Sequence, residues 1–224
     1  MTAIDAILIA AGFVAGAGID TGAAQYARSV AGSNADSVSE STLVTRLLSS
    51  FAGVGAAVLA VGLAPSELRL FTAAFGGILL ALANIDFRTQ LLPDLLNAAL
   101  LLLGAAMVLV TRREEWLMHA AGAVIGFAVL WAVETGYRRL RGREGLGRGD
   151  AKLLGAIGVW VGAMSLPHVL LVASLSGIAA AIIQSWRRAA PIGAATAIAF
   201  GPWIALGGFT VWLLQLTAPQ LLGY

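Results

Sequence analysis

Long apolar runs separated by short polar breaks are the feature that most constrains the fold of this chain. Hydrophobic residues make up 59% of the 224 positions and charged residues only 12%, a balance that no soluble domain of this size needs. A membrane-spanning helix needs about 20 mostly apolar residues. We count eight candidate spans, at approximately 4–25, 44–64, 68–85, 95–110, 117–136, 151–166, 168–186 and 196–217. The expected fold class is therefore all-α, a polytopic membrane protein with about eight transmembrane helices in a single domain, 1–224.

The placement of basic residues predicts which side of the membrane each loop faces, because Lys and Arg are enriched in cytoplasmic loops. With the N-terminus outside, the loops after odd-numbered spans and their span edges hold eleven basic residues and the opposite side holds three. The eleven are Arg28, Arg46, Arg88, Arg138, Arg139, Arg141, Arg143, Arg148, Lys152, Arg187 and Arg188, and the three are Arg69, Arg112 and Arg113. This bias predicts that both termini lie outside and that the polar loop 29–42 is cytoplasmic.

Two aspartates stand where an apolar run meets a polar loop. Asp86 ends the third predicted span and Asp150 begins the sixth, so both fall at the cytoplasmic end, while His119 and His168 fall at the opposite end. Ionisable groups at membrane depth are costly and usually functional. Two carboxyls in a semi-buried cleft share one proton, so that one can activate water while the other polarises a peptide carbonyl. The pair therefore suggests aspartic-protease chemistry, provided that the tertiary fold brings the two together.

The neighbours of the aspartates could support such a site. Gly147 and Gly149 would let backbone or substrate approach Asp150 closely, and they tolerate unusual dihedral angles. Arg88 and Lys152 each follow an aspartate by two positions and could tune its charge. The chain has no cysteine and only two histidines, so we expect no thiol nucleophile, no disulfide and no metal site.

Structural explanations of the acidic residues stay open. Asp94 and Asp150 each precede an apolar run and fit the N-cap of a helix. Asp20 is a rival acid within the first span, and Glu134 is placed to pair with Arg138 one helical turn later. A lone Gly-x-Gly-Asp motif is a weak signal, equally typical of a glycine-rich turn followed by a cap.

Three other function classes compete with proteolysis. Intramembrane acids can form the relay of a proton-coupled transporter, but we find no inverted repeat and no acid in the middle of a span. A catalytically silent assembly factor would need neither aspartate. A Ser–Lys hydrolase would have to use Lys152, the only lysine, which has no serine near it in the sequence. Nucleic-acid binding is not expected, because the basic residues alternate with spans.

The segments around both aspartates resemble the type IV prepilin leader peptidases. Ile85 to Asp94 is similar to the first aspartate box of that family, Gly145 to Leu154 to the second, and Ala199 to Leu206 weakly to a third segment. The resemblance covers about residues 68–210. It implies an intramembrane aspartyl protease whose two catalytic acids are Asp86 and Asp150. The supporting residues of the two boxes are Arg88, Pro93, Asp94, Gly147, Gly149 and Lys152, with Asp94 outside the catalytic pair.

The resemblance also implies a substrate and a location. The substrates would be prepilin-like precursors (pilins or type II secretion pseudopilins) with a short basic leader, cleaved after Gly at the cytoplasmic face of the bacterial inner membrane, in contact with membrane lipid and without a cofactor. Larger family members carry a zinc-binding insert with paired Cys-x-x-Cys motifs and also methylate the new N-terminus from S-adenosylmethionine. The cysteine-free loop 29–42 stands in place of that insert. We therefore predict the peptidase activity and leave the methyltransferase activity open.

Overall fold

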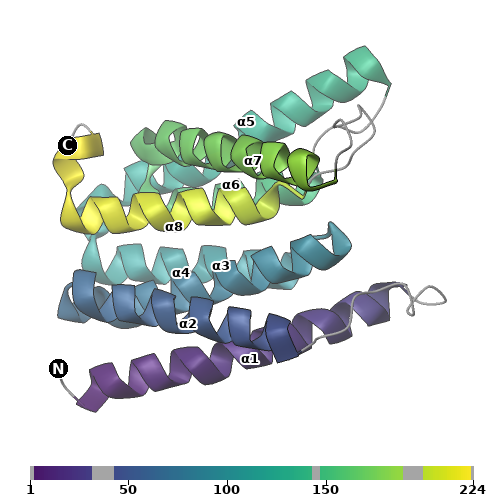
Figure 1. The fold of residues 1–224 in the computed structure, drawn as a ribbon. Helices are drawn as coiled ribbons and strands as arrows, with labels where there is room; N and C mark the ends of the chain where they lie inside the picture. Colours follow the sequence, from purple (N-terminus) through teal and green to yellow (C-terminus); the bar gives the residue numbers. More distant parts are fainter. Residues whose placement is uncertain (1–2, 32–42, 143–146, 189–198, 223–224) are drawn as a thin grey trace.

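The computed structural model describes residues 3–31, 43–142, 147–188 and 199–222, and these ranges contain helices and no strand (Figure 1). The α-helices are α1 (Ala3–Ala31), α2 (Leu43–Leu63), α3 (Arg69–Thr89), α4 (Asp94–Thr111), α5 (Trp116–Arg141), α6 (Arg148–Val161), α7 (Leu166–Arg188) and α8 (Gly201–Thr217). Short 3-10 turns follow or precede them at Ser66–Leu68, Arg113–Glu115, Ala163–Ser165 and Pro219–Leu222. The expected all-α class is confirmed.

Six of these helices, α1 to α5 and α7, are long and apolar enough to cross a membrane. The other two are shorter, with 14 residues in α6 and 17 in α8. Nearly all of α6 from Asp150 to Val161 is buried, so it is a central helix enclosed by protein rather than by lipid. The chain is a polytopic membrane protein.

Several helix boundaries differ from those expected from the sequence. The predicted span 151–166 starts at Arg148 and stops at Val161, because Gly162 takes a φ of 75° that ends the helix. The predicted loop 29–42 begins later than expected, since α1 continues through Ala31; residues 32–42 lie outside the described ranges. The same holds for 189–198, which include the start of the last predicted span.

Successive helices run in opposite directions, so both ends of the chain lie at one end of the bundle (Figure 1). The C-terminal end of α3 and the N-terminal ends of α4, α6 and α8 meet at the other end. Helix α8 packs against α3, α6 and α7, and α4 packs against α3 and α6. The centre of the bundle is therefore formed by α3, α4, α6 and α8, with α1 and α2 on one side and α5 and α7 on the other.

An aromatic cluster joins the four central helices. Phe75 of α3 stacks on Trp160 of α6 with ring centroids 4.3 Å apart, and Trp212 of α8 meets the Trp160 ring edge-on at 5.6 Å. The Trp160 Nε1–H donates to the Leu100 carbonyl of α4 at 2.9 Å, and the Trp212 Nε1–H donates to Thr72 Oγ1 of α3 at 3.0 Å. Buried rings that also satisfy their N–H groups contribute both apolar area and direction to the packing.

This cluster sets the register of α3 against α6. Asp86 lies eleven residues after Phe75 in α3, and Asp150 lies ten residues before Trp160 in α6. At a rise of about 1.5 Å per residue, the two aspartates lie about 16 Å and about 15 Å from the stacked rings. Because the two helices are antiparallel, both displacements point toward the same end of the bundle. The stack therefore brings the two aspartates to nearly the same level.

Glycines let neighbouring helices approach closely. A Cβ on Gly122 of α5 would lie 2.2 Å from the Gly158 carbonyl oxygen of α6, and one on Gly158 would lie 2.1 Å from the Gly122 oxygen. The α1–α2 pair is equally tight, since a Cβ on Gly12 would lie 2.6 Å from the Gly53 oxygen. Small residues at such crossings drive helix association in membranes through close packing.

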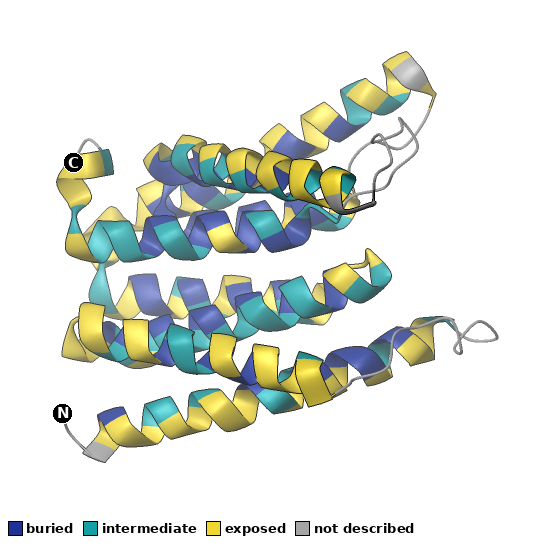
Figure 2. Cartoon of the chain, in the orientation of Figure 1, coloured by how far each residue is buried: buried dark blue, intermediate teal, exposed yellow. Residues whose placement is uncertain are grey.

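The outward faces of the helices are apolar. Figure 2 shows buried residues along the inward faces and exposed residues on the outer surface. That surface carries large hydrophobic side chains, including Leu95, Leu140, Val110 and Trp186. An apolar exterior is the arrangement expected for helices surrounded by lipid.

We expect Trp160→Ala to lower the free energy of unfolding by about 3–5 kcal/mol, because it removes a fully buried ring from the junction of four helices. The matched control is Trp186→Ala, which removes an 80% exposed ring from the outer face of α7 and should change stability little. Thermal unfolding of the detergent-solubilised variants measures both. Equal stability of the two variants would contradict the central role of the cluster.

Candidate active site

Asp86 lies in the last turn of α3 and is only 4% exposed. Its Oδ2 accepts a hydrogen bond from the backbone N–H of Gly201 at 3.1 Å. Gly201 is the first residue of α8, where backbone N–H groups have no partner inside the helix and the helix dipole favours negative charge. The end of α3 thus places a carboxylate against the start of α8.

Asp150 lies in the first turn of α6 and is 6% exposed. The N-cap of α6 is Gly147, whose carbonyl accepts the Asp150 N–H at 3.1 Å, and no side-chain cap bond forms. The N-cap explanation of Asp150 is therefore wrong, because the Gly147–Gly149 segment already begins the helix. The same correction applies to Asp94, since Pro93 is the N-cap of α4.

One leucine, Leu92, lies against the glycine next to each aspartate. Leu92 Cβ lies 2.9 Å from the position that a Cβ on Gly149 would occupy, and Leu92 Cδ1 lies 3.3 Å from the corresponding position on Gly201. Gly149 directly precedes Asp150, and Gly201 holds Asp86. The two carboxyls are close enough for the charge of one to act on the other. The structure therefore brings Asp86 and Asp150 together, although they are far apart in the sequence.

Of the two reasons expected for the glycines of the second box, the structure supports only close approach, and only at Gly149. Neither Gly147 nor Gly149 takes a positive φ, so unusual dihedral angles are not the reason for them. Gly149 does permit a close approach, by Leu92. A Cβ on Gly147 would meet only Asp150 Oδ2, at an ordinary contact distance of 3.5 Å.

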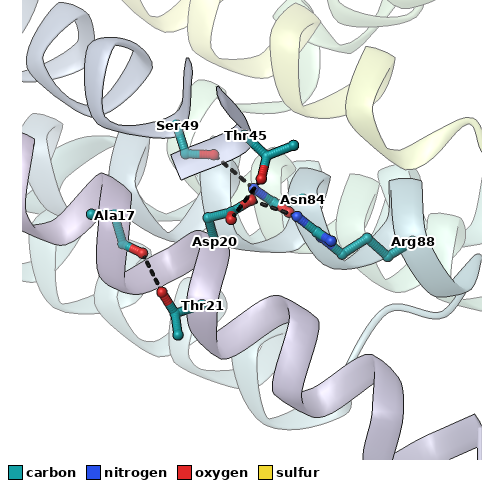
Figure 3. A network of polar contacts seen from close by, with 7 residues as sticks. All are labelled: Ala17, Asp20, Thr21, Thr45, Ser49, Asn84 and Arg88. Atoms are coloured by element: carbon teal, nitrogen blue, oxygen red, sulfur yellow. Dashed lines mark hydrogen bonds and ion pairs between the residues drawn. The ribbon is translucent and has the colours of Figure 1, made fainter. Parts of the chain in front are cut away.

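Arg88 does not serve Asp86 as expected but pairs with Asp20. Its Nη2 lies 2.5 Å from Asp20 Oδ1, and both side chains are buried. Figure 3 shows the surrounding network: Thr45 Oγ1 donates to Asp20 Oδ2 at 3.0 Å, and Asn84 accepts from Arg88 Nε and donates to Ser49 Oγ, each at 2.9 Å. Asp20, the rival acid, is thus neutralised in an ion pair that joins α1 to α3, and the hydrogen bond from Thr45 adds α2 to the network.

Lys152 likewise does not serve Asp150. Its Nζ lies 2.6 Å from Asp94 Oδ1, an exposed ion pair that joins the starts of α6 and α4. Pro93, with a φ of −61°, leads directly into α4. The expected pairing of Glu134 with Arg138 is confirmed at 3.6 Å.

The histidines lie away from the aspartates. His119 begins α5 at the opposite end of the bundle and its Nδ1 lies 2.7 Å from the Val159 carbonyl oxygen, while His168 begins α7 at that same end. Among the residues that the structure describes, no group of three or more His, Asp or Glu side chains could hold a metal ion.

Comparisons with known proteins agree with the two boxes. The family model described as "Type IV leader peptidase family" matches residues 73–182, a range that contains both aspartates. A protein of Escherichia coli (strain K12) is 45% identical over 174 residues, which cover 70% of this chain and 72% of that protein. The chain belongs to the type IV leader peptidase family.

Other relatives in the family are longer. A protein of Dickeya chrysanthemi is 43% identical over 59% of this chain and 46% of its own length, and one of Pectobacterium carotovorum subsp. carotovorum is 41% identical over 58% and 46%. All three relatives are named prepilin leader peptidase/N-methyltransferase. The chain thus matches about half the length of the latter two. No solved structure matches the chain.

Two residues of the site were missed by reasoning from the sequence. Gly201 lies in the weakly matching third segment, which was a usable signal, but its contact with Asp86 depends on how α8 meets α3. Leu92 stands in a run of apolar residues and nothing in the sequence distinguishes it from Leu91 or Leu95. Only the tertiary fold reveals that it lies against Gly149 and Gly201.

We expect Gly201→Ala to reduce cleavage of a leader-bearing family substrate roughly a hundredfold, the scale of a misplacement of about 1 Å at a reacting group. The new Cβ would lie 2.7 Å from Asp86 Oδ2 and would push the carboxylate from its place. Gly77→Ala is the control on the same helix as Asp86, because its Cβ would meet nothing within 4 Å. Equal cleavage rates for both variants would contradict the role of Gly201.

Proposed function

We propose that this chain is an intramembrane aspartic endopeptidase that removes the short basic leader from type IV prepilin-like precursors, which are pilins or type II secretion pseudopilins. The observation that carries the proposal is the pair of buried carboxyls, Asp86 and Asp150, which two central helices bring to the same end of the bundle. Family membership supports the same activity, since the relatives are named prepilin leader peptidases.

In the proposed mechanism, Asp86 and Asp150 hold one proton between them, because two adjacent carboxylates resist ionising together. The ionised carboxylate takes a proton from water as the water oxygen attacks the scissile carbonyl carbon. The protonated carboxyl gives its proton to the carbonyl oxygen. When the tetrahedral intermediate collapses, the C–N bond breaks. The amine nitrogen takes the proton that the first carboxylate received from water, and a hydroxyl of the intermediate returns its proton to the other carboxylate, so that the pair again holds one proton. The Gly201 N–H keeps the Asp86 carboxylate in position throughout.

Two basic residues near the aspartates in the sequence, Arg88 and Lys152, are each paired with another acid. Arg88 is neutralised by Asp20, and Lys152 by Asp94, so neither cation opposes a basic segment at the mouth of the site. Cleavage after Gly, just before the hydrophobic helix of the precursor, is the remaining part of the proposed specificity.

The proposed location is the bacterial inner membrane, with the aspartates at the cytoplasmic face and both termini outside. The end of the bundle that holds the aspartates also carries basic residues, including Arg28, Arg138 and Arg148. Arg69 and Arg113 lie at the opposite end. This asymmetry supports the orientation through the positive-inside rule.

A proton-coupled transporter is the main alternative. A relay would need buried acids that are free to exchange protons along a path. The buried acids away from the site are instead ion-paired: Asp5 with Arg69 at 2.8 Å, Asp20 with Arg88, and Glu134 with Arg138. The ion pairs favour the peptidase over the transporter.

We do not propose the methyltransferase activity, because the loop that replaces the zinc-binding insert has no cysteine.

We expect Asp86→Asn and Asp150→Asn each to reduce cleavage of a co-expressed prepilin by about 10²–10⁴-fold, the usual contribution of a general acid or base. Asn keeps the size of the side chain, and at position 86 it keeps an oxygen to accept the Gly201 N–H. Glu114→Gln is the control, because Glu114 lies in the exposed turn Arg113–Glu115 at the opposite end of the bundle. Mass spectrometry of the precursor measures processing. Full activity in either variant contradicts the assignment, and retained biological function without processing would favour a silent assembly factor.

A further inference from the structure

Leu92 lies against the two glycines that adjoin the aspartates. It is half-buried, and its side chain fills the space in front of Gly149 and Gly201, the two glycines beside Asp150 and Asp86. A methyl group on either glycine would lie within 3.3 Å of Leu92, closer than nearly all real Cβ contacts. Each glycine therefore makes room for the same leucine. The side chain also packs against the hydrophobic core of the bundle, which limits its retreat.

The segment that carries Leu92 is anchored on both sides. Before it, Gln90 ends α3 with a φ of 55°, the one positive φ at a non-glycine residue in the described ranges, and its N–H bonds to the Asp86 carbonyl at 2.8 Å. Thr89 Oγ1 accepts the Leu91 N–H at 3.1 Å. After Leu92, Pro93 leads into α4, whose start is tied to α6 by the Asp94–Lys152 pair. Leu92 is thus a fixed wall of the site rather than a freely moving side chain.

A peptide that reaches the two carboxyls must place its scissile carbonyl beside this wall. The residue that supplies the carbonyl then has its Cα next to Leu92, in the space that a side chain would need. Adding even one methyl group to a filled space forces side chains from their rotamers or shifts the backbone. A residue without a Cβ avoids that conflict.

We propose that Leu92 determines specificity at this site by restricting the residue that supplies the scissile carbonyl to glycine. This inference rests on the proposed peptidase function and deepens it. It assigns the glycine requirement to one side chain, which lies against the glycines beside both aspartates.

The test compares two precursors, one with Gly and one with Ala before the cleavage site, on the intact enzyme and on Leu92→Ala. We expect the intact enzyme to prefer the Gly precursor in kcat/KM by about tenfold or more, the usual scale for one excess carbon in a filled pocket. Leu92→Ala should cleave the Gly precursor and reduce that preference by about tenfold. Leu91→Ala is the matched control, because Leu91 is the exposed neighbour in the same segment, and it should keep the original preference.

The outcomes separate this inference from the proposed function. If the intact enzyme cleaves neither precursor, the peptidase proposal is overturned. If Leu92→Ala cleaves the Gly precursor but keeps the full preference against Ala, the role of Leu92 is overturned. Leu92→Val serves as a milder variant if Leu92→Ala does not fold, and it should reduce the preference partially. Leu92→Met conserves the side-chain volume and should keep the preference, so a loss with Met would also count against the inference.

Discussion

The stacking of Phe75 on Trp160 is the contact on which the rest of the structure depends. It joins two helices that are not neighbours in the sequence, and Trp212 and the Leu100 carbonyl extend it to the other two central helices. Because α3 and α6 are antiparallel, this one contact fixes how far the residues of α3 lie along the bundle relative to those of α6. The aspartates lie about three helical turns from that contact on each helix, so their levels agree without further adjustment.

Ion pairs near the site engage Arg88 and Lys152, and Asp86 and Asp150 take no part in them. Two of the cations close to them in the sequence are paired with other acids, Arg88 with Asp20 and Lys152 with Asp94. Those ion pairs also join α1 to α3 and α4 to α6. A buried ion pair is costly to break, because the remaining charge is left uncompensated. The same residues thus hold the helices around the site and leave the electrostatics of the aspartates undisturbed by a direct cation.

Much of the fold could be predicted from the sequence, because apolar run length and the bias of basic residues are local signals. Placing Asp86 and Asp150 at one end needed only the alternation of spans. The partner of Arg88 could not be predicted, since Asp20 is 68 residues away and meets it through helix packing. The N-cap assignments failed because the N-caps are Pro93 and Gly147, which lie one and three residues before the aspartates. The position of Leu92 could not be predicted from the sequence, because it depends on two glycines from different helices.

Proximity of Asp86 and Asp150 is the central claim, and the natural lack of cysteine makes it directly measurable. The measurement is cross-linking of an Asp86→Cys, Asp150→Cys double variant in membranes with a short thiol-reactive reagent, with the linked peptides identified by mass spectrometry. The positive control is Asp94→Cys with Lys152→Cys, because the 2.6 Å contact between Lys152 Nζ and Asp94 Oδ1 places the two positions within the span of a linker as long as the lysine side chain. Asp86→Cys with His119→Cys is the negative control. The account predicts a cross-link in the aspartate pair and in the positive control only. A cross-link in the positive control without one between positions 86 and 150 would contradict it.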